Sequence, residues 1–97
     1  QENQITLLQK VVLEASLGKF PEDRKSTSEI LQLLTQERTG VVLLKAFSLI
    51  SSGHKSDLLD LQIGLAALVR LGLLEEFKNI ASEVLILDYF QKTLERS

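Results

Sequence analysis

Apolar residues recur along this chain at the three- and four-residue spacing of a helix, and no stretch alternates polar with apolar residues as a half-buried strand does. The first helical segment runs from about Gln4 to Leu17, where Gly18 can end it. Pro21 removes an amide donor from the segment that follows, which predicts a loop from Lys19 to Lys25. We expect Phe20 in that loop to pack into the core.

Two shorter segments continue the helical period. The first runs from about Ser28 to Glu37, and Ser26 has the spacing of a capping box with Glu29, which places the helix start near these residues. We expect Thr39-Gly40 to separate this helix from a third one, about Val41 to Ser51. The pattern so far predicts three helices and no strand.

The fourth segment, about Asp57 to Leu71, is apolar in nearly every direction around the helix axis. Gly53 and the connector His54 to Ser56 precede it, Asp57 is a good N-cap, and Gly72 can end it. A helix surrounded by other helices shows this pattern, whereas a surface helix has one polar face. We therefore predict that this helix is the centre of the protein.

A fifth helix starts near Glu75 and Glu76, because acidic side chains favour the positive end of a helix. Apolar residues at helical spacing follow from Phe77 to Leu85. Beyond Leu85 the apolar stripe drifts, and the helix either breaks near Asp88 or continues towards the end of the sequence. Together the segments predict an all-α fold: a compact bundle of about five helices in antiparallel hairpins, with a solenoid-like arrangement as a possible variant.

The stretch ALVRLGLLEEFKNIASEVL joins a helix with small residues, a Leu-Gly turn, and a helix that starts with two glutamates and an aromatic ring. These features resemble the helical hairpin of tetratricopeptide-like α-solenoids. The matching positions are Ala67, Leu71, Gly72, Glu75, Glu76, Phe77, Ala81 and Leu85. The match covers about a fifth of the chain, and the signature Trp, Tyr and Pro of that family and its period of about thirty-four residues are absent. The resemblance implies a helical scaffold that binds other proteins.

The phrase LVRLGLLEE within this stretch also looks like part of a winged helix, which would make the fifth helix a DNA-reading element. Such a helix presents Lys, Arg, Asn or Gln to phosphates and base edges. Here it carries Glu75, Glu76 and Glu83 against Lys78, and residues 84–94 lack the Gly, Pro or Asn that the hairpin of a wing needs. Both observations speak against DNA binding. A nucleic-acid-binding regulator, of the helix-turn-helix or winged-helix kind, is kept as the alternative function.

No catalytic constellation stands out in the sequence. His54 is the only histidine and cysteine is absent, so a usual zinc site has too few ligands. Adjacent carboxylates such as Glu75 and Glu76 point apart on a helix, and the five glycines are too widely separated to form a phosphate-binding loop. We predict a protein that is not an enzyme and that has no catalytic residue, cofactor or metal.

The 97 residues have the length of one domain, and the apolar fraction of 44% is that of an ordinary globular protein. The formal charge of -2 is spread without long runs, so charge indicates no partner. The most apolar segment, Leu58 to Leu74, is interrupted by polar residues. It therefore lacks the ~18 continuous apolar residues that a membrane span needs. Because methionine is absent, we expect residues 1–97 to be one helical domain of a longer chain, and the compartment stays open.

Apolar residues that exceed what one helix face can bury indicate a surface for another protein. The residues that we single out as a possible interface are Val41, Leu44, Leu73, Leu74, Ile86 and Tyr89. The partner is expected to be another domain of the same chain or further copies of the protein. The sequence therefore predicts a non-catalytic protein-interaction or assembly module that self-associates or belongs to a larger helical array.

Overall fold

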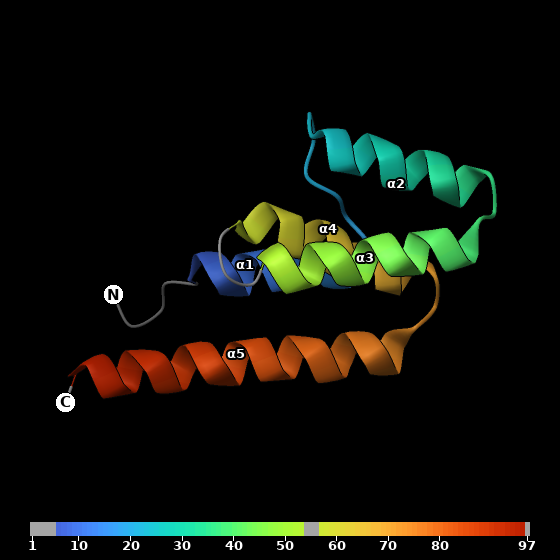
Figure 1. Cartoon of the computed structure of the whole chain (residues 1–97). Coiled ribbons are helices and arrows are strands. Elements are labelled where there is room, and N and C mark those ends of the chain that lie inside the picture. Colours follow the sequence, from blue (N-terminus) through green and yellow to red (C-terminus); the bar gives the residue numbers. More distant parts are fainter. Residues whose placement is uncertain (1–5, 54–56, 97) are drawn as a thin grey trace.

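The structure is a computed structural model that describes residues 6–53 and 57–96, and it consists of five helices with no strand in those ranges (Figure 1). The helices are α1 (Leu7–Ser16), α2 (Lys25–Thr35), α3 (Thr39–Gly53), α4 (Leu58–Arg70) and α5 (Leu74–Arg96). The predicted all-α bundle of about five helices is confirmed. The first residues of the expected leading helix, before Thr6, and the connector His54 to Ser56 lie outside the described residues.

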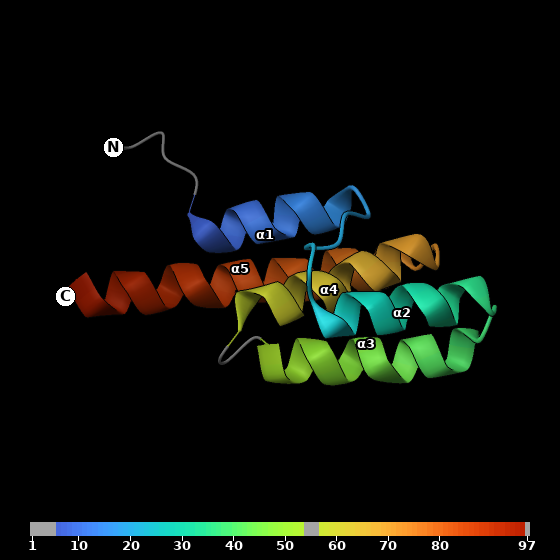
Figure 2. The ribbon, with the colours of Figure 1, turned by 90° about the horizontal axis from the view of Figure 1, so that it is seen from above.

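Helix α4 lies at the centre of the bundle. It runs between α2 and α5 in Figure 1, and Figure 2 shows α1 and α3 on its two remaining sides. All residues from Leu61 to Leu68 are buried. The predicted central position of this segment is confirmed, and α4 runs antiparallel to both α3 and α5 (Figures 1 and 2).

The predicted ends of α4 are also confirmed. The Asp57 carboxylate accepts a hydrogen bond of 3.0 Å from the Leu59 amide and so caps the first turn. After the last turn, Gly72 has a φ of 80°, which a residue with a β-carbon rarely adopts. The Leu73 amide then donates to the Leu68 carbonyl and closes the helix end. Local sequence signals therefore fix both ends of the central helix.

The start of α2 differs from the prediction. The helix begins at Lys25, and Ser26 and Glu29 do not form the expected capping box. The Glu29 carboxylate instead pairs with the Lys45 ammonium group on α3, 2.7 Å away, and this bond lowers the pKa of Glu29. Glu29 therefore forms an ion pair between two helices and not a local cap. A capping box does form in α1, between Thr6 and Gln9.

An ion pair between distant parts of the chain accompanies the early start of α2. The Arg24 guanidinium lies 2.6 Å from Asp57 and 3.3 Å from Asp60, both at the start of α4. The hydrogen bond from Arg24 holds the pKa of Asp57 below its ordinary value, and the same contact raises the pKa of Arg24. The loop before α2 is thereby fastened to α4.

The break between α2 and α3 lies earlier than predicted. It falls at Gln36 to Arg38, and Gly40 is inside the first turn of α3. Glu37 adopts a φ of 56°, and the Arg38 amide donates to the Leu33 carbonyl, which closes the end of α2. A glutamate in the left-handed region gives no signal in the sequence, because glycine is the usual residue there.

The connection between α1 and α2 is held against α4 by two long side chains. Gln62 donates to the Lys19 carbonyl oxygen at 2.9 Å, and Arg70 donates to the Gly18 carbonyl oxygen at 2.8 Å. The Arg70 guanidinium also lies 5.0 Å from the centre of the Phe20 ring, which packs against the core as expected. Gly18 ends α1 as predicted, with a φ of 72°.

Helix α5 does not break near Asp88. It continues for 23 residues, about 35 Å at 1.5 Å per residue, whereas α4 has 13 residues and spans about 20 Å. Asp88 pairs within the helix with Lys92, at 3.3 Å. Since α5 is longer than the helices beside it, its C-terminal part projects beyond the end of the bundle (Figures 1 and 2).

Candidate interaction surface on the last helix

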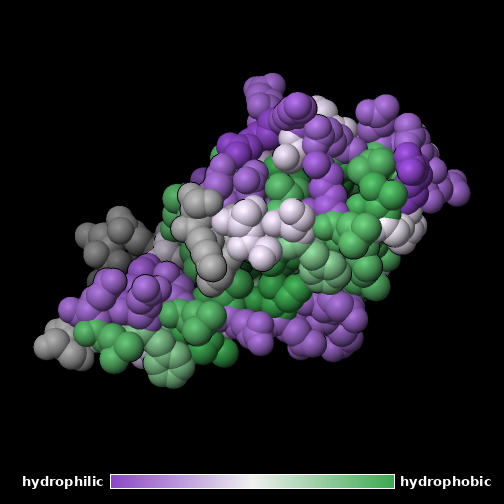
Figure 3. Space-filling model, viewed as in Figure 1, coloured by the Kyte–Doolittle hydropathy of each residue, from purple (hydrophilic) through white to green (hydrophobic). Residues whose placement is uncertain are grey.

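The projecting part of α5, residues 86–96, is named here the overhang. Five large apolar side chains on it are more than half exposed: Ile86 (53%), Leu87 (55%), Tyr89 (68%), Phe90 (56%) and Leu94 (73%). Figure 3 shows hydrophobic atoms gathered over this end of α5, at the lower left of the view. Apolar side chains so close together along one helix form a patch, which single exposed leucines do not.

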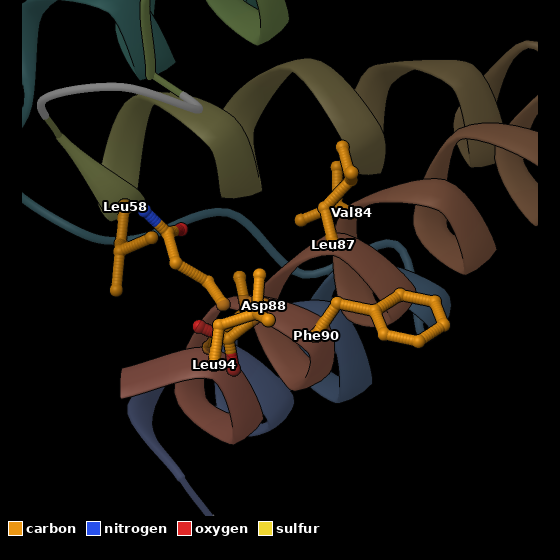
Figure 4. Close-up of a pocket in the computed structure, with 8 residues that line it drawn as sticks. Leu58, Val84, Leu87, Asp88, Phe90 and Leu94 are labelled. Carbon is orange, nitrogen blue, oxygen red and sulfur yellow. The ribbon is translucent and has the colours of Figure 1, made fainter. Parts of the chain in front are cut away.

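The overhang forms one wall of an open groove of about 430 Å³. Its residues come from the starts of α1 and α4 and from α5: Leu8, Leu58, Val84, Leu87, Asp88, Phe90, Gln91 and Leu94. In Figure 4, Leu58 of α4 lies on one side of the groove, and Asp88 and Leu94 of α5 lie across from it. The groove is therefore mainly apolar, with Asp88 and Gln91 as its polar residues.

The sequence of α5 explains why the groove opens at this end. From Leu73 onwards, alternating spacings of four and three residues define a stripe at positions 73, 77, 80, 84, 87, 91 and 94. All of these residues are apolar except Gln91. Phe77 and Val84 of this stripe are buried in the core. Leu87 and Leu94 continue the same stripe where α1 and α4 are only beginning, so they have few neighbours to cover them.

A second groove, of about 450 Å³, runs along the other side of α5. Phe47 and Ile50 of α3 line it together with Ile80, Val84 and Leu87 of α5. Among the described residues, no Cα atom of α3 lies within 8 Å of a Cα atom of α5, so the two backbones do not approach closely. Leu87 lines both grooves, so the overhang offers apolar surface on two sides.

The six residues that the sequence singles out lie in different places. Ile86 and Tyr89 are on the overhang. Val41 and Leu44 are in the first half of α3, 38% and 75% exposed, and Val41 lines a shallow groove between α2 and α3.

The other two predicted residues are at the turn between α4 and α5. Leu74 is 51% exposed, whereas Leu73 is half-buried and packs against the core. This turn and the start of α3 lie at the end of the bundle away from the overhang (Figure 1). The structure therefore brings together only Ile86 and Tyr89, and it adds Leu87, Phe90 and Leu94, which the sequence pattern gave no reason to place on the surface.

Within the described ranges, no three His, Cys, Asp or Glu side chains are grouped so that they could hold a metal ion. Among the helices described, none is both long and apolar enough to cross a membrane.

Comparisons with models of protein families, with curated proteins and with solved structures give no match to this chain.

Proposed function

We propose that this protein is a non-catalytic helical protein-interaction module, and that the overhang of α5 with its adjoining groove is the docking surface. The observation that carries the proposal is the group of five large apolar side chains, each more than half exposed, within nine residues of one helix. Removing apolar surface from water is favourable by roughly 25 cal/mol per Å², so a partner that covers these side chains gains binding free energy.

The shape of the surface supports binding of a helix. An amphipathic helix binds by placing an apolar face in an apolar groove. The groove between Leu58 of α4 and Leu94 of α5 is open and mainly apolar, as such a ligand requires. The resemblance of the α4–α5 hairpin to tetratricopeptide-like solenoids points to the same class of function, a scaffold for other proteins.

Nucleic-acid binding is less well supported. Glu75, Glu76 and Glu83 are exposed on the first half of α5, where a recognition helix would need positive side chains. Residues 84–94 are helical, so they do not form the hairpin of a wing. The charges and the helix both favour a protein as the partner.

Photo-crosslinking in cells tests the proposal. Phe90 is replaced by p-benzoylphenylalanine in the full-length protein, and the control carries the same residue in place of Gln32, which is exposed on α2. We expect protein adducts on irradiation from position 90 and far fewer from position 32. Equal adduct formation from the two positions, or none from position 90, would refute a docking surface on the overhang.

A further inference from the structure

We infer that the partner of the overhang is a second copy of this protein: two α5 overhangs pack antiparallel around a two-fold axis, each covering the apolar side chains of the other. This inference rests on the proposed interaction function and names the partner. An antiparallel arrangement is required because the first half of α5 is fixed to its own bundle, so two parallel overhangs would force the bundles together. A two-fold contact uses the same patch on both copies.

The exposed apolar area indicates a small, weak dimer. An aromatic side chain offers about 150–250 Å² and an aliphatic one about 60–120 Å² of apolar surface. Tyr89 is two positions from both Leu87 and Gln91, so it lies on another side of the helix and one partner helix does not cover it. With the exposed fractions of the other four large apolar residues, the overhang offers roughly 280 Å² on each copy. Since about 65% of a homodimer interface is apolar, two overhangs correspond to roughly 850 Å² in total, the size of a weak contact.

The charges of the overhang also fit a second copy. Residues 86–96 contain two acidic residues, Asp88 and Glu95, and two basic residues, Lys92 and Arg96, so their formal charges cancel. Asp88 and Lys92 already pair with each other. A neutral surface does not repel its own copy, and it offers no attraction to a strongly charged partner.

The spacing of the stripe on α5 fits the packing of one helix against another. Spacings of four and three place residues 87, 91 and 94 on the seam that two packed helices share in a coiled coil. In the first half of α5 the same seam is filled by the protein's own core. Gln91 is the polar residue of the exposed part, and a polar residue in such a seam favours one register and one oligomer size.

Sedimentation equilibrium with a matched pair of variants tests the inference. Leu94 on the overhang is 73% exposed and Leu44 on α3 is 75% exposed, so Leu94→Glu and Leu44→Glu place a charge at equally accessible helix positions. We expect the protein to dimerise, Leu94→Glu to weaken the dimer by at least about tenfold, and Leu44→Glu to leave it unchanged. Circular dichroism of both variants verifies that they fold.

Cysteine chemistry gives a second readout, because the chain has no cysteine of its own. Gln91→Cys is expected to form linked dimers with a short bismaleimide, whereas Gln32→Cys, exposed on α2, is not. A protein that stays monomeric at its highest soluble concentration overturns the inference, as does a Leu44→Glu variant that dissociates the dimer as strongly as Leu94→Glu. If position 90 still crosslinks to other proteins in cells, the interaction function stands and only the second copy is wrong.

Discussion

Gly64 of α4 lies so close to Ala46 of α3 that a β-carbon at position 64 would be 2.6 Å from the Ala46 carbonyl oxygen. The same β-carbon would lie 2.6 Å from the Ile50 side chain and 3.2 Å from the Ile50 amide nitrogen. Because backbone atoms cannot move aside as a flexible side chain does, we expect Gly64→Ala to push α3 and α4 apart. The free energy of unfolding, measured by urea denaturation, should fall by roughly 2 kcal/mol.

Gly40 provides the matched control for this prediction. It also lies within a helix, but a β-carbon there would meet no described atom within 4 Å. Alanine is the better helix former, so Gly40→Ala should leave the free energy of unfolding unchanged or raise it by up to about 1 kcal/mol. Similar destabilisation by the two substitutions would show that the gap between α3 and α4 is not the cause.

The ion pair between Arg24 and Asp57 predicts a dependence of stability on pH. The hydrogen bond from Arg24 keeps the pKa of Asp57 in the folded protein below its ordinary value of 3.8. A lowered folded-state pKa stabilises the fold above the ordinary value, and this stabilisation is lost as the pH falls through the folded-state value. Asp57→Asn should therefore unfold at a lower urea concentration than the wild type at pH 7, and the difference should shrink as the pH falls below 3.8.

Asparagine can still accept the hydrogen bond from the Leu59 amide, so this substitution removes the charge and keeps a good cap. Glu22→Gln, at an exposed residue that forms no ion pair with the other described residues, serves as the control and should change stability little at either pH. A difference between Asp57→Asn and the wild type that is equally large in acid would contradict the assignment.

Arg70 binds the α1–α2 connection through both its hydrogen bond to Gly18 and its position over the Phe20 ring. Lysine keeps the charge but lacks the planar group that can make both contacts at once. We expect Arg70→Lys to lower the free energy of unfolding by about 1 kcal/mol. Arg38→Lys changes an exposed arginine in the turn between α2 and α3 and should have an effect within about 0.5 kcal/mol. Thermal melts of the two variants, compared at equal concentration, check this difference.

Binding to duplex DNA should be absent or weak even at low salt. Fluorescence anisotropy of a labelled duplex of about 20 bp, in about 50 mM salt, measures this directly, because phosphate contacts are strongest there. The exposed Glu75, Glu76 and Glu83 are the physical reason for the expectation. An affinity that falls steeply with added salt would instead favour the nucleic-acid-binding alternative.

The central helix was predictable because its signals are local. An apolar pattern on all sides, an aspartate before it and a glycine after it act within one stretch, and the structure confirms each at Asp57, residues 61–68 and Gly72. The start of α2 was not predictable in this way. Glu29 suits a local cap, but Lys45 comes within 2.7 Å of it only when α2 and α3 are packed together.

The overhang was predicted only in part, for a related reason. Ile86 and Tyr89 could be named as surplus apolar residues, but Leu87 and Leu94 follow a stripe that is core in the first half of α5, and Phe90 lies beside that stripe. Whether such residues are covered depends on where the neighbouring helices start. The one usable signal was the lack of glycine and proline from Leu73 to the end of the sequence, which permits a helix longer than the others.

The position of the buried helix as the fourth in chain order has a consequence for synthesis. Until Arg70 has left the ribosome, the apolar faces of α1 and α3 lack the helix against which they pack most extensively. A nascent chain that ends before Leu58 therefore exposes these faces to water and to other chains. Completion of α4, rather than formation of the earlier helices, is the event that ends this exposure during translation.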